Sequence, residues 1–194
     1  KGADRTQHEK KEAARRCDLF SQFAMGAAVQ AVRDSCLEKS PIDPKRIGVI
    51  IGTGTGGIAT FEENMRTFIE KGPSRVSPFF VPMFMANVAS AIVSMRYGFQ
   101  GPNYGTVSAC ASSGHALGDA FDLIRENKAD VMVAGGSEAA ITPLALASFA
   151  NMKALSERND DPKTASRPFD KDRDGFVMGD GAAVVILEEW ERAK

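Results

Sequence analysis

The sequence predicts an α/β protein, because apolar strands alternate with helices along the chain. Arg46–Gly52, Ala129–Gly135 and Ala182–Glu189 are short and apolar, and they are rich in the β-branched residues typical of buried strands. The segments between them carry apolar residues at helical spacing or begin with helix-capping residues. Alternation of the two kinds of element indicates layers of helix and sheet.

In the first part of the chain, we expect one helix before the first strand and one after it. One helix runs from Cys17 to about Val32 after a polar start, and the other covers Ile58–Ile69, with its apolar residues on one side. Between the strand and the second helix, Gly52–Gly57 is predicted to be a glycine-rich turn. Three prolines make Lys71–Pro82 a predicted loop.

The middle of the chain continues the alternation. Asn87–Arg96 is predicted to be a mostly apolar helix, closed by Gly98. Tyr104–Ala109 is predicted to be a strand that leads directly into a helix ending near Asn127.

The last part combines a capped helix with a long loop. Thr142 and Pro143 form the start of a helix, since threonine caps and proline suits the first helical position. Residues 156–176 have no periodicity, and loops of this length are usually functional or disordered. The chain opens on a helix and closes on the strand 182–189, so we expect it to be part of a larger fold.

Length and composition fit one globular domain that spans residues 1–194, with 43% hydrophobic and 25% charged residues. The net charge of -1 gives no field that would favour nucleic acid or an anionic membrane. We find no bilayer-spanning run and no signal peptide. Three cysteines without a C-x-x-C pair favour a reducing compartment, by default the cytoplasm, over disulfides or a zinc site.

The strongest functional signal is the segment 104–114, which reads YGTVSACASSG. A short apolar run stops at Cys110, small residues follow, and a helical pattern begins. A thiol on such a turn is exposed at the positive end of a helix dipole, which favours the reactive thiolate. The alternative is an inert, buried cysteine, because most free cysteines pack as small hydrophobes.

A cysteine nucleophile normally needs a base, and neither histidine suits Cys110. His115 is five residues further on, about 140° around a helix of 3.6 residues per turn, so it should face away from the thiol. His8 lies in the polar start. Either the helix dipole alone activates the thiol, or its partner lies outside these residues.

Two other motifs have plainer interpretations. Gly52–Gly57 matches G-x-G-x-x-G, but the acidic residue expected roughly 20 positions on is replaced by a loop, so we expect no nucleotide cofactor. We interpret these glycines as a close approach of two backbones beside a pocket. Asp170–Gly175 matches half of a calcium loop, but its twelfth position is Gly181, so we expect a turn rich in charge pairs and no metal.

Longer motifs cover nearly the whole chain. Besides the glycine turn, they are GPNYGTVSACASSGHALGDAF, VMVAGGSEAAITPLALASFANMKALS, SRPFDKDRDGFVMGDGAAVVILEE and GPSRVSPFFVP. They resemble segments of the β-ketoacyl-[acyl-carrier-protein] synthases, the condensing enzymes of fatty-acid synthesis, and RPFDKDRDGFVMGDG is more similar to type II than to type I.

This resemblance implies a thiolase-like fold, with helices packed on both faces of a mixed sheet, in two similar halves. Residues 1–194 would be the N-terminal half, without the opening strand of the family. The C-terminal half, absent here, would carry two catalytic histidines and a lysine. That would explain why no base is found for Cys110, and the fragment alone should be unable to complete condensation.

The resemblance also implies a mechanism for Cys110. The thiol would take an acyl group from the phosphopantetheine thioester of acyl carrier protein, and its own N–H would help bind the oxyanion. Malonyl-carrier would then lose carbon dioxide and attack the acyl-enzyme. The substrates are carried on the phosphopantetheine of the carrier protein, so no cofactor is expected. The resemblance also implies a homodimer.

Other roles follow residue by residue. Phe149 matches a gating phenylalanine, although a core aromatic is the alternative, and Thr55 stands where type II members usually carry isoleucine near the distal acyl pocket. Phe80 is expected at the dimer interface, closing the acyl pocket of the partner. Four basic residues match the surface that receives the acidic carrier, or else form a solvated face: Arg15, Arg16, Arg75 and Lys153.

Three alternatives remain open. A non-catalytic chain-length or interaction subunit of the same family is one, although such subunits usually replace the nucleophile. A β-ketoacyl synthase serving polyketide synthesis is another. A cysteine-dependent acyl hydrolase would need a histidine within reach of Cys110.

Overall fold

The computed structural model describes residues 16–194, which form two compact units. The first unit ends at Ala139 and resumes at Gly181, and it contains the sheet. The second unit is Ala140–Asp180. Within residues 16–194, no helix combines the length and the apolar character needed to cross a bilayer.

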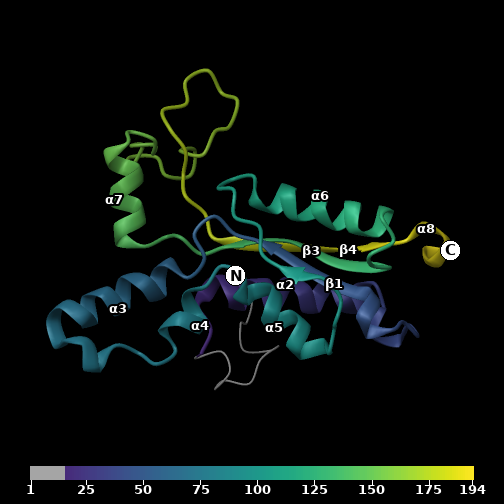
Figure 1. The fold of residues 1–194 in the computed structure, drawn as a ribbon. Coiled ribbons are helices and arrows are strands. Elements are labelled where there is room, and N and C mark those ends of the chain that lie inside the picture. Colours follow the sequence, from purple (N-terminus) through teal and green to yellow (C-terminus); the bar gives the residue numbers. More distant parts are fainter. Residues whose placement is uncertain (1–15) are drawn as a thin grey trace. The chain divides into compact units, whose positions relative to one another are not determined.

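The sheet of the first unit is mixed, as predicted. Its order is β2-β1-β3-β4, where β1 is Ile47–Gly52, β2 is Asn103–Tyr104, β3 is Val131–Glu138 and β4 is Gly181–Glu188. β1 pairs in parallel with both β2 and β3, and β4 runs antiparallel to β3 (Figure 1). β1 is buried along its whole length, which explains its unbroken apolar sequence.

Helices α2 (Leu19–Asp34) and α5 (Val88–Tyr97) cover one face of the sheet (Figure 1). The Asp18 side chain caps α2 by accepting a hydrogen bond from the Phe20 N–H at 3.2 Å. The two helices and the sheet share one buried cluster, whose largest fully buried members are Phe20, Met25, Val32, Val49, Ile51, Val93, Val131 and Val133.

Helix α6 (Ser112–Arg125) covers the opposite face. Its buried residues Ala116 and Ala120 pack against Ile50 and Met132 of the sheet. These short side chains let the helix lie close to the strands. Helices therefore cover both faces of the sheet, as the predicted fold class requires.

A third helical region packs through aromatic rings. Helix α3 (Ile58–Lys71), the 3-10 turn η3 (Pro73–Arg75) and helix α4 (Phe80–Phe84) follow one another. Phe61, Phe80 and Phe84 have ring centroids 5.5 to 6.3 Å apart. The predicted loop Lys71–Pro82 therefore extends too far. Its last residues, from Phe80 on, belong to α4, which the aromatic contact favours.

The predicted strand Tyr104–Ala109 is wrong in length, since only Asn103 and Tyr104 pair in the sheet. After Tyr104, the backbone makes other hydrogen bonds: the Thr106 carbonyl accepts from the Thr53 N–H, and the Ser108 N–H donates to the Ser112 hydroxyl. The chain turns out of the sheet because these bonds replace the strand ladder.

The remaining short elements connect the larger ones. They are the 3-10 turns η1 (Leu37–Lys39) and η2 (Pro44–Arg46) and the terminal helix α8 (Trp190–Ala193), which the sequence did not predict. α8 is capped by Glu189, whose side chain accepts from the Arg192 N–H at 3.0 Å.

The second unit contains helix α7 (Pro143–Asn151) and the long loop that follows it. Thr142 caps α7, as predicted, by accepting a hydrogen bond from the Ala145 N–H at 3.2 Å. Residues 156–176 contain no helix or strand element, as the missing periodicity predicted.

Candidate functional site

Cys110 lies on the turn between the sheet and α6, where its side chain is exposed, as the sequence pattern predicts. The preceding residue, Ala109, has a φ of 52°, in the left-handed region that residues with a side chain seldom adopt. Backbone strain of this kind persists only where the surroundings fix it, and it is frequent at functional sites. We refer to residues 108–112 as the cysteine elbow.

The buried hydroxyl of Ser112 holds the cysteine elbow in shape. It accepts a hydrogen bond from the Ser108 N–H at 2.8 Å. Its own proton can go to the Ala109 carbonyl, 2.7 Å away, or to the Thr53 carbonyl at 3.1 Å. This one side chain therefore ties both ends of the elbow to the glycine turn.

The backbone donors of the cysteine elbow are not all used. The Ala111 N–H donates to the Ser108 carbonyl and the Ser112 N–H to the Ala109 carbonyl. The N–H of Cys110 has no acceptor among residues 16–194. A free N–H beside an exposed thiol, just before the first turn of a helix, is a suitable donor for an oxyanion.

His115 has a partner in the cysteine elbow other than the thiol. Its Nδ1 atom lies 2.6 Å from the Ser108 hydroxyl, with which it shares a hydrogen bond. The structure therefore pairs His115 with the first residue of the elbow, and that its ring faces away from Cys110 stays a prediction. The second histidine, His8, lies outside the described residues.

The glycine turn packs directly beneath the cysteine elbow. A Cβ atom added to Gly54 would lie 2.8 Å from a carboxylate oxygen of Glu138 and 3.6 Å from the Ala109 Cα. One added to Gly52 would lie 2.4 Å from the Ser112 carbonyl oxygen. These distances support the interpretation of the motif as a close approach of backbones.

The donors of the glycine turn are occupied by the protein itself. The Gly54 N–H donates to Glu138 at 2.6 Å, and the Gly56 N–H donates to the Thr53 hydroxyl at 3.1 Å. A carboxylate thus lies where a phosphate would need to bind. This arrangement disfavours a dinucleotide at the motif, since a phosphate would meet a like charge.

Thr55 is exposed at the tip of the glycine turn, and its hydroxyl donates to Glu138 at 2.7 Å. Sequence reasoning identified Thr55 but missed Glu138. The only available signal was its position after the buried strand 129–135, at the same end of a parallel pair as the glycine turn.

Among the basic residues predicted to dock the carrier, two lie in the first unit. The Arg16 guanidinium lies 5.0 Å from the centre of the Phe79 ring, a cation–π contact, and Arg75 is exposed at the end of η3. Arg15 falls outside the described residues. Phe80 is part of the aromatic contact between α3 and α4.

Phe149 and Lys153 belong to the second unit. The Phe149 ring packs edge-on against Phe176, with the centroids 5.3 Å apart, so it has a partner within its own unit. Lys153 is exposed directly after α7 and has a φ of 58°.

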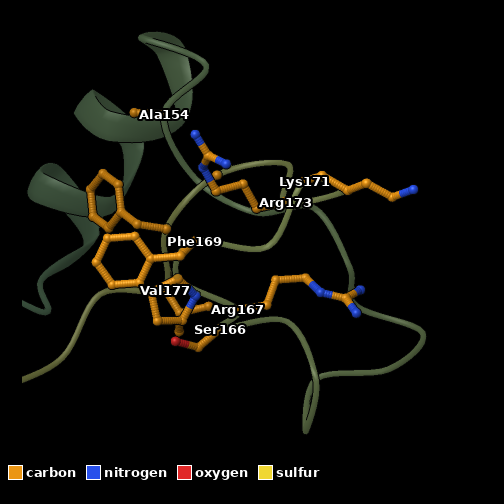
Figure 2. A pocket seen from close by; sticks show the side chains of 10 residues that line it. Ala154, Ser166, Arg167, Phe169, Lys171, Arg173 and Val177 are labelled. Atoms are coloured by element: carbon orange, nitrogen blue, oxygen red, sulfur yellow. The ribbon is translucent and has the colours of Figure 1, made fainter.

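The second unit also contains a pocket of about 820 Å³ (Figure 2). Figure 2 shows that it is lined mainly by the 166–177 part of the long loop, including Arg167, Phe169, Lys171 and Arg173. None of the residues predicted for the site lines it.

The calcium-like segment is a turn with internal partners, as expected. Asp170 accepts from the Asp172 N–H at 2.7 Å, and its carboxylate lies 3.6 Å from Arg167. Asp174 accepts from the Ser156 hydroxyl and the Glu157 N–H, and these bonds, the hydroxyl first, lower the pKa of its carboxyl group. Within residues 16–194, no group of three or more histidines, cysteines or carboxylates could hold a metal ion.

One titratable group near the elbow is perturbed. Burial raises the pKa of Tyr104 to about 12, and Asp119, which accepts the phenol hydrogen bond at 3.2 Å, adds to the shift. Tyr104 is therefore neutral at physiological pH and acts as a hydrogen-bond donor.

The chain is similar to several known proteins along its whole length. A family model described as Beta-ketoacyl synthase, N-terminal domain, matches residues 3–193. The chain is 51% identical to the 3-oxoacyl-[acyl-carrier-protein] synthase 2 of Synechocystis sp. over 193 residues, and 50% identical to that of Vibrio cholerae over 194. Both matches cover 100% of this chain, but only 46% and 47% of the length of these relatives.

Solved structures show the same fold. A β-ketoacyl synthase from Burkholderia phymatum STM815 matches with a TM-score of 0.88 and 32% identity, over 99% of this chain and 47% of that one. A ketosynthase solved in complex with its type II polyketide acyl-carrier protein matches with a TM-score of 0.85 and 36% identity, over 90% and 44%. The chain thus spans about half the length of the relatives it matches, and the fold is thiolase-like, as predicted.

Proposed function

The chain belongs to the β-ketoacyl synthase family, and from this premise we propose that it supplies the acyl-accepting nucleophile of a 3-oxoacyl-[acyl-carrier-protein] synthase in fatty-acid elongation. The observation that carries the proposal is the exposed Cys110 thiol beside its own free N–H, on a strained turn before α6. The segment that holds it lies inside the family match.

In the proposed first step, the Cys110 thiolate attacks the carbonyl carbon of a thioester carried on phosphopantetheine. The oxyanion that forms accepts a hydrogen bond from the Cys110 N–H. When the carbonyl re-forms, the bond from carbon to the pantetheine sulfur breaks, and that sulfur leaves as a thiolate and takes up a proton. The product is an acyl-enzyme on Cys110.

The second step is the attack of a decarboxylated malonyl-carrier on this acyl-enzyme. We propose that residues 1–194 are the N-terminal half of the synthase and that the groups promoting decarboxylation lie in a C-terminal half. Two facts support this division: the chain covers 46% and 47% of its relatives, and His115 is engaged with Ser108. The chain by itself should form the acyl-enzyme but not complete condensation.

The proposed partner is acyl carrier protein, an acidic protein. One relative, at 36% identity, was solved in complex with its carrier. Arg16, Arg75 and Lys153 are the described basic positions proposed to receive it, and Arg15 is proposed on sequence alone. Reversing the charge of Arg16 and Arg75 should weaken carrier binding at low salt. If the variant binds the carrier as tightly as wild type at low salt, neither residue belongs to the docking surface.

Three residues are proposed to shape the acyl pocket. Thr55 is exposed at the turn beneath the elbow and would limit chain length, Phe80 would close the pocket of a dimer partner, and Phe149 would gate the nucleophile. A homodimer is proposed because the chain belongs to this family. Thr55→Ile should shift the acyl-enzyme towards shorter chains because the larger side chain takes up pocket volume.

Fatty-acid elongation is favoured over polyketide synthesis, since relatives at about half identity are 3-oxoacyl synthases. A non-catalytic subunit is disfavoured because Cys110 is present. A cytoplasmic location is proposed, because three cysteines without a C-x-x-C pair favour a reducing compartment. No cofactor is proposed, because the substrates are carried on phosphopantetheine.

The test is the mass of the intact protein that contains this chain after incubation with an acyl-carrier thioester. We expect one added acyl group, mapped to Cys110 by peptide analysis and absent in Cys110→Ala. Cys36 is the matched control because it is also an exposed free thiol, with a φ of 57°. Cys36→Ser should keep the adduct. An adduct that survives Cys110→Ala, or none under conditions that acylate a known synthase, would refute the proposal.

A further inference from the structure

The carboxylate of Glu138 makes three hydrogen bonds to consecutive residues of the glycine turn. Its Oε1 atom accepts from the hydroxyls of Thr53 and Thr55, at 3.1 and 2.7 Å, and its Oε2 atom accepts from the Gly54 N–H at 2.6 Å. The Thr53 hydroxyl in turn accepts from the Gly56 N–H at 3.1 Å. One side chain therefore fixes the backbone and both hydroxyls of the turn.

None of these partners is a cation. Within residues 16–194, no ion pair involves Glu138, and its donors are two hydroxyls and one amide. Hydroxyl and amide donors stabilise a carboxylate only when they are correctly aimed. The arrangement thus depends on the geometry of the turn.

The turn that Glu138 holds is in contact with the cysteine elbow. The Thr53 carbonyl lies 3.1 Å from the Ser112 hydroxyl, and the Thr53 N–H donates to the Thr106 carbonyl at 3.1 Å. The space beside the Gly54 Cα is closed on one side by Glu138 and on the other by Ala109. A displacement of the turn would therefore displace the residue that precedes Cys110.

We propose that Glu138 is a positioning residue that acts through the glycine turn on Cys110. Held by Glu138, the turn supports the left-handed backbone of Ala109 and so keeps the Cys110 thiol and N–H in their reactive arrangement. The inference rests on the proposed acyl transfer for its role in catalysis, but the effect of Glu138 on the thiol is independent of that function.

The same contact defines what Thr55 offers to an acyl chain. Its hydroxyl is bonded to Glu138, so the atom of Thr55 left for an apolar substrate is its methyl group. A threonine at this position then behaves as an apolar residue of small volume. Removing Glu138 should free the hydroxyl and turn the same residue into a polar one.

The experiment measures two rates in the intact protein: alkylation of Cys110 by iodoacetamide, mapped by mass, and acylation of Cys110 by an acyl-carrier thioester. Glu138→Ala should lower both about tenfold or more. Glu138→Gln keeps the size of the side chain but replaces one acceptor by an amide donor, so a reduction of about threefold is expected. In acylation, kcat should fall while KM for the carrier stays the same.

Glu188→Ala is the matched control. Glu188 lies at the opposite end of the same ladder, opposite Val131, whereas Glu138 is opposite Gly181. Both rates of the Glu188→Ala variant should equal those of wild type. Thr55→Val completes the design: it removes one of the three bonds to Glu138, so it should slow alkylation of Cys110 less than Glu138→Ala does.

The outcomes separate the two proposals. If wild type is alkylated at Cys110 but never acylated, the proposed function fails, and slower alkylation of the Glu138 variants still supports the positioning role. If a folded Glu138→Ala protein keeps both wild-type rates, the positioning role is overturned. Should that variant not fold, Glu138→Gln decides, and wild-type rates in it overturn the inference equally.

Discussion

The two ends of the β1–β3 pair each carry a carboxylate, and they hold it in different ways. At the amino end, Asp130 pairs with the Arg46 guanidinium at 2.6 Å, and Arg46 also donates to the Asn127 carbonyl at 2.9 Å. The hydrogen bond from Arg46 lowers the pKa of the Asp130 carboxyl group. At the carboxyl end, Glu138 binds two hydroxyls and an amide N–H.

The difference separates two ways of holding the ends of the sheet. At the amino end, a hydrogen-bonded ion pair joins Arg46, just before β1, to Asp130, just before β3, and solvent screens it because both side chains are partly exposed. At the carboxyl end, the bonds of Glu138 and Ser112 are made with uncharged partners, and they lie beside a left-handed residue and an exposed thiol. The end beside the proposed site is thus held by a network of uncharged partners, and the opposite end by an ion pair.

The largest effect is expected where the helix α6 touches the carboxyl end. A Cβ atom on Gly136 would lie 2.4 Å from the Ser113 Cβ, so Gly136→Ala should lower the free energy of unfolding by about 1–3 kcal/mol through overpacking. Gly118 of α6 has open space at its Cβ position, so Gly118→Ala should raise the free energy of unfolding by about 0.5–1 kcal/mol. Urea unfolding measures both, and equal changes would contradict the close contact.

Ser112→Ala should come next, since it tests the hydroxyl that holds the elbow. It leaves the Ser108 N–H without its acceptor, which should cost about 1–2 kcal/mol and slow Cys110 alkylation. Ser35, whose hydroxyl donates to Val32 at the end of α2, is the control. Ser35→Ala should leave alkylation of Cys110 unchanged. A Ser112→Ala protein with normal alkylation would contradict the role of the Ser112 hydroxyl in holding the elbow.

Asp130→Asn should have a smaller effect, about 0.5–1 kcal/mol at neutral pH, because the ion pair is partly exposed and screened. The pKa of Asp130 is lowered in the folded state, so its stabilisation is present above the unfolded value of about 3.9 and is lost as the pH falls through the folded value. Acid unfolding should be less steep in the variant. Identical acid profiles would show that the pair contributes nothing.

The last effect is confined to high pH and concerns Tyr104. Its pKa is raised to about 12 in the folded state, so folding binds its proton more tightly, and stability should fall between pH about 10 and 12. Tyr104→Phe should remove this dependence. The tyrosinate absorbance that is present in wild type and lost in Tyr104→Phe reports this group. Titration near 10 would disprove the shift.

The sequence predicted most elements, with their ends shifted by a few residues. It failed at Tyr104–Ala109, because the bonds that end the strand come from Thr53 and Ser112, which an alternating pattern does not reveal. It also missed α4, whose aromatic contact with Phe61 is made across a loop.

For the site, the sequence by itself identified the exposed cysteine that we propose as the nucleophile. Small residues around Cys110, between an apolar run and a helical pattern, encode a turn that exposes a thiol. The long motifs determined the family in the same way, because both signals are local and need no knowledge of what lies nearby in space.

Only the tertiary structure decided what supports that thiol. Glu138 and Thr55 are 83 positions apart, and they meet because β1 pairs with β3 in a register that places Gly52 beside Gly136. The pairing of His115 with Ser108 likewise required coordinates. A local sequence pattern specifies backbone preference and chemistry, but the partner of a side chain depends on strand register, which the whole core sets.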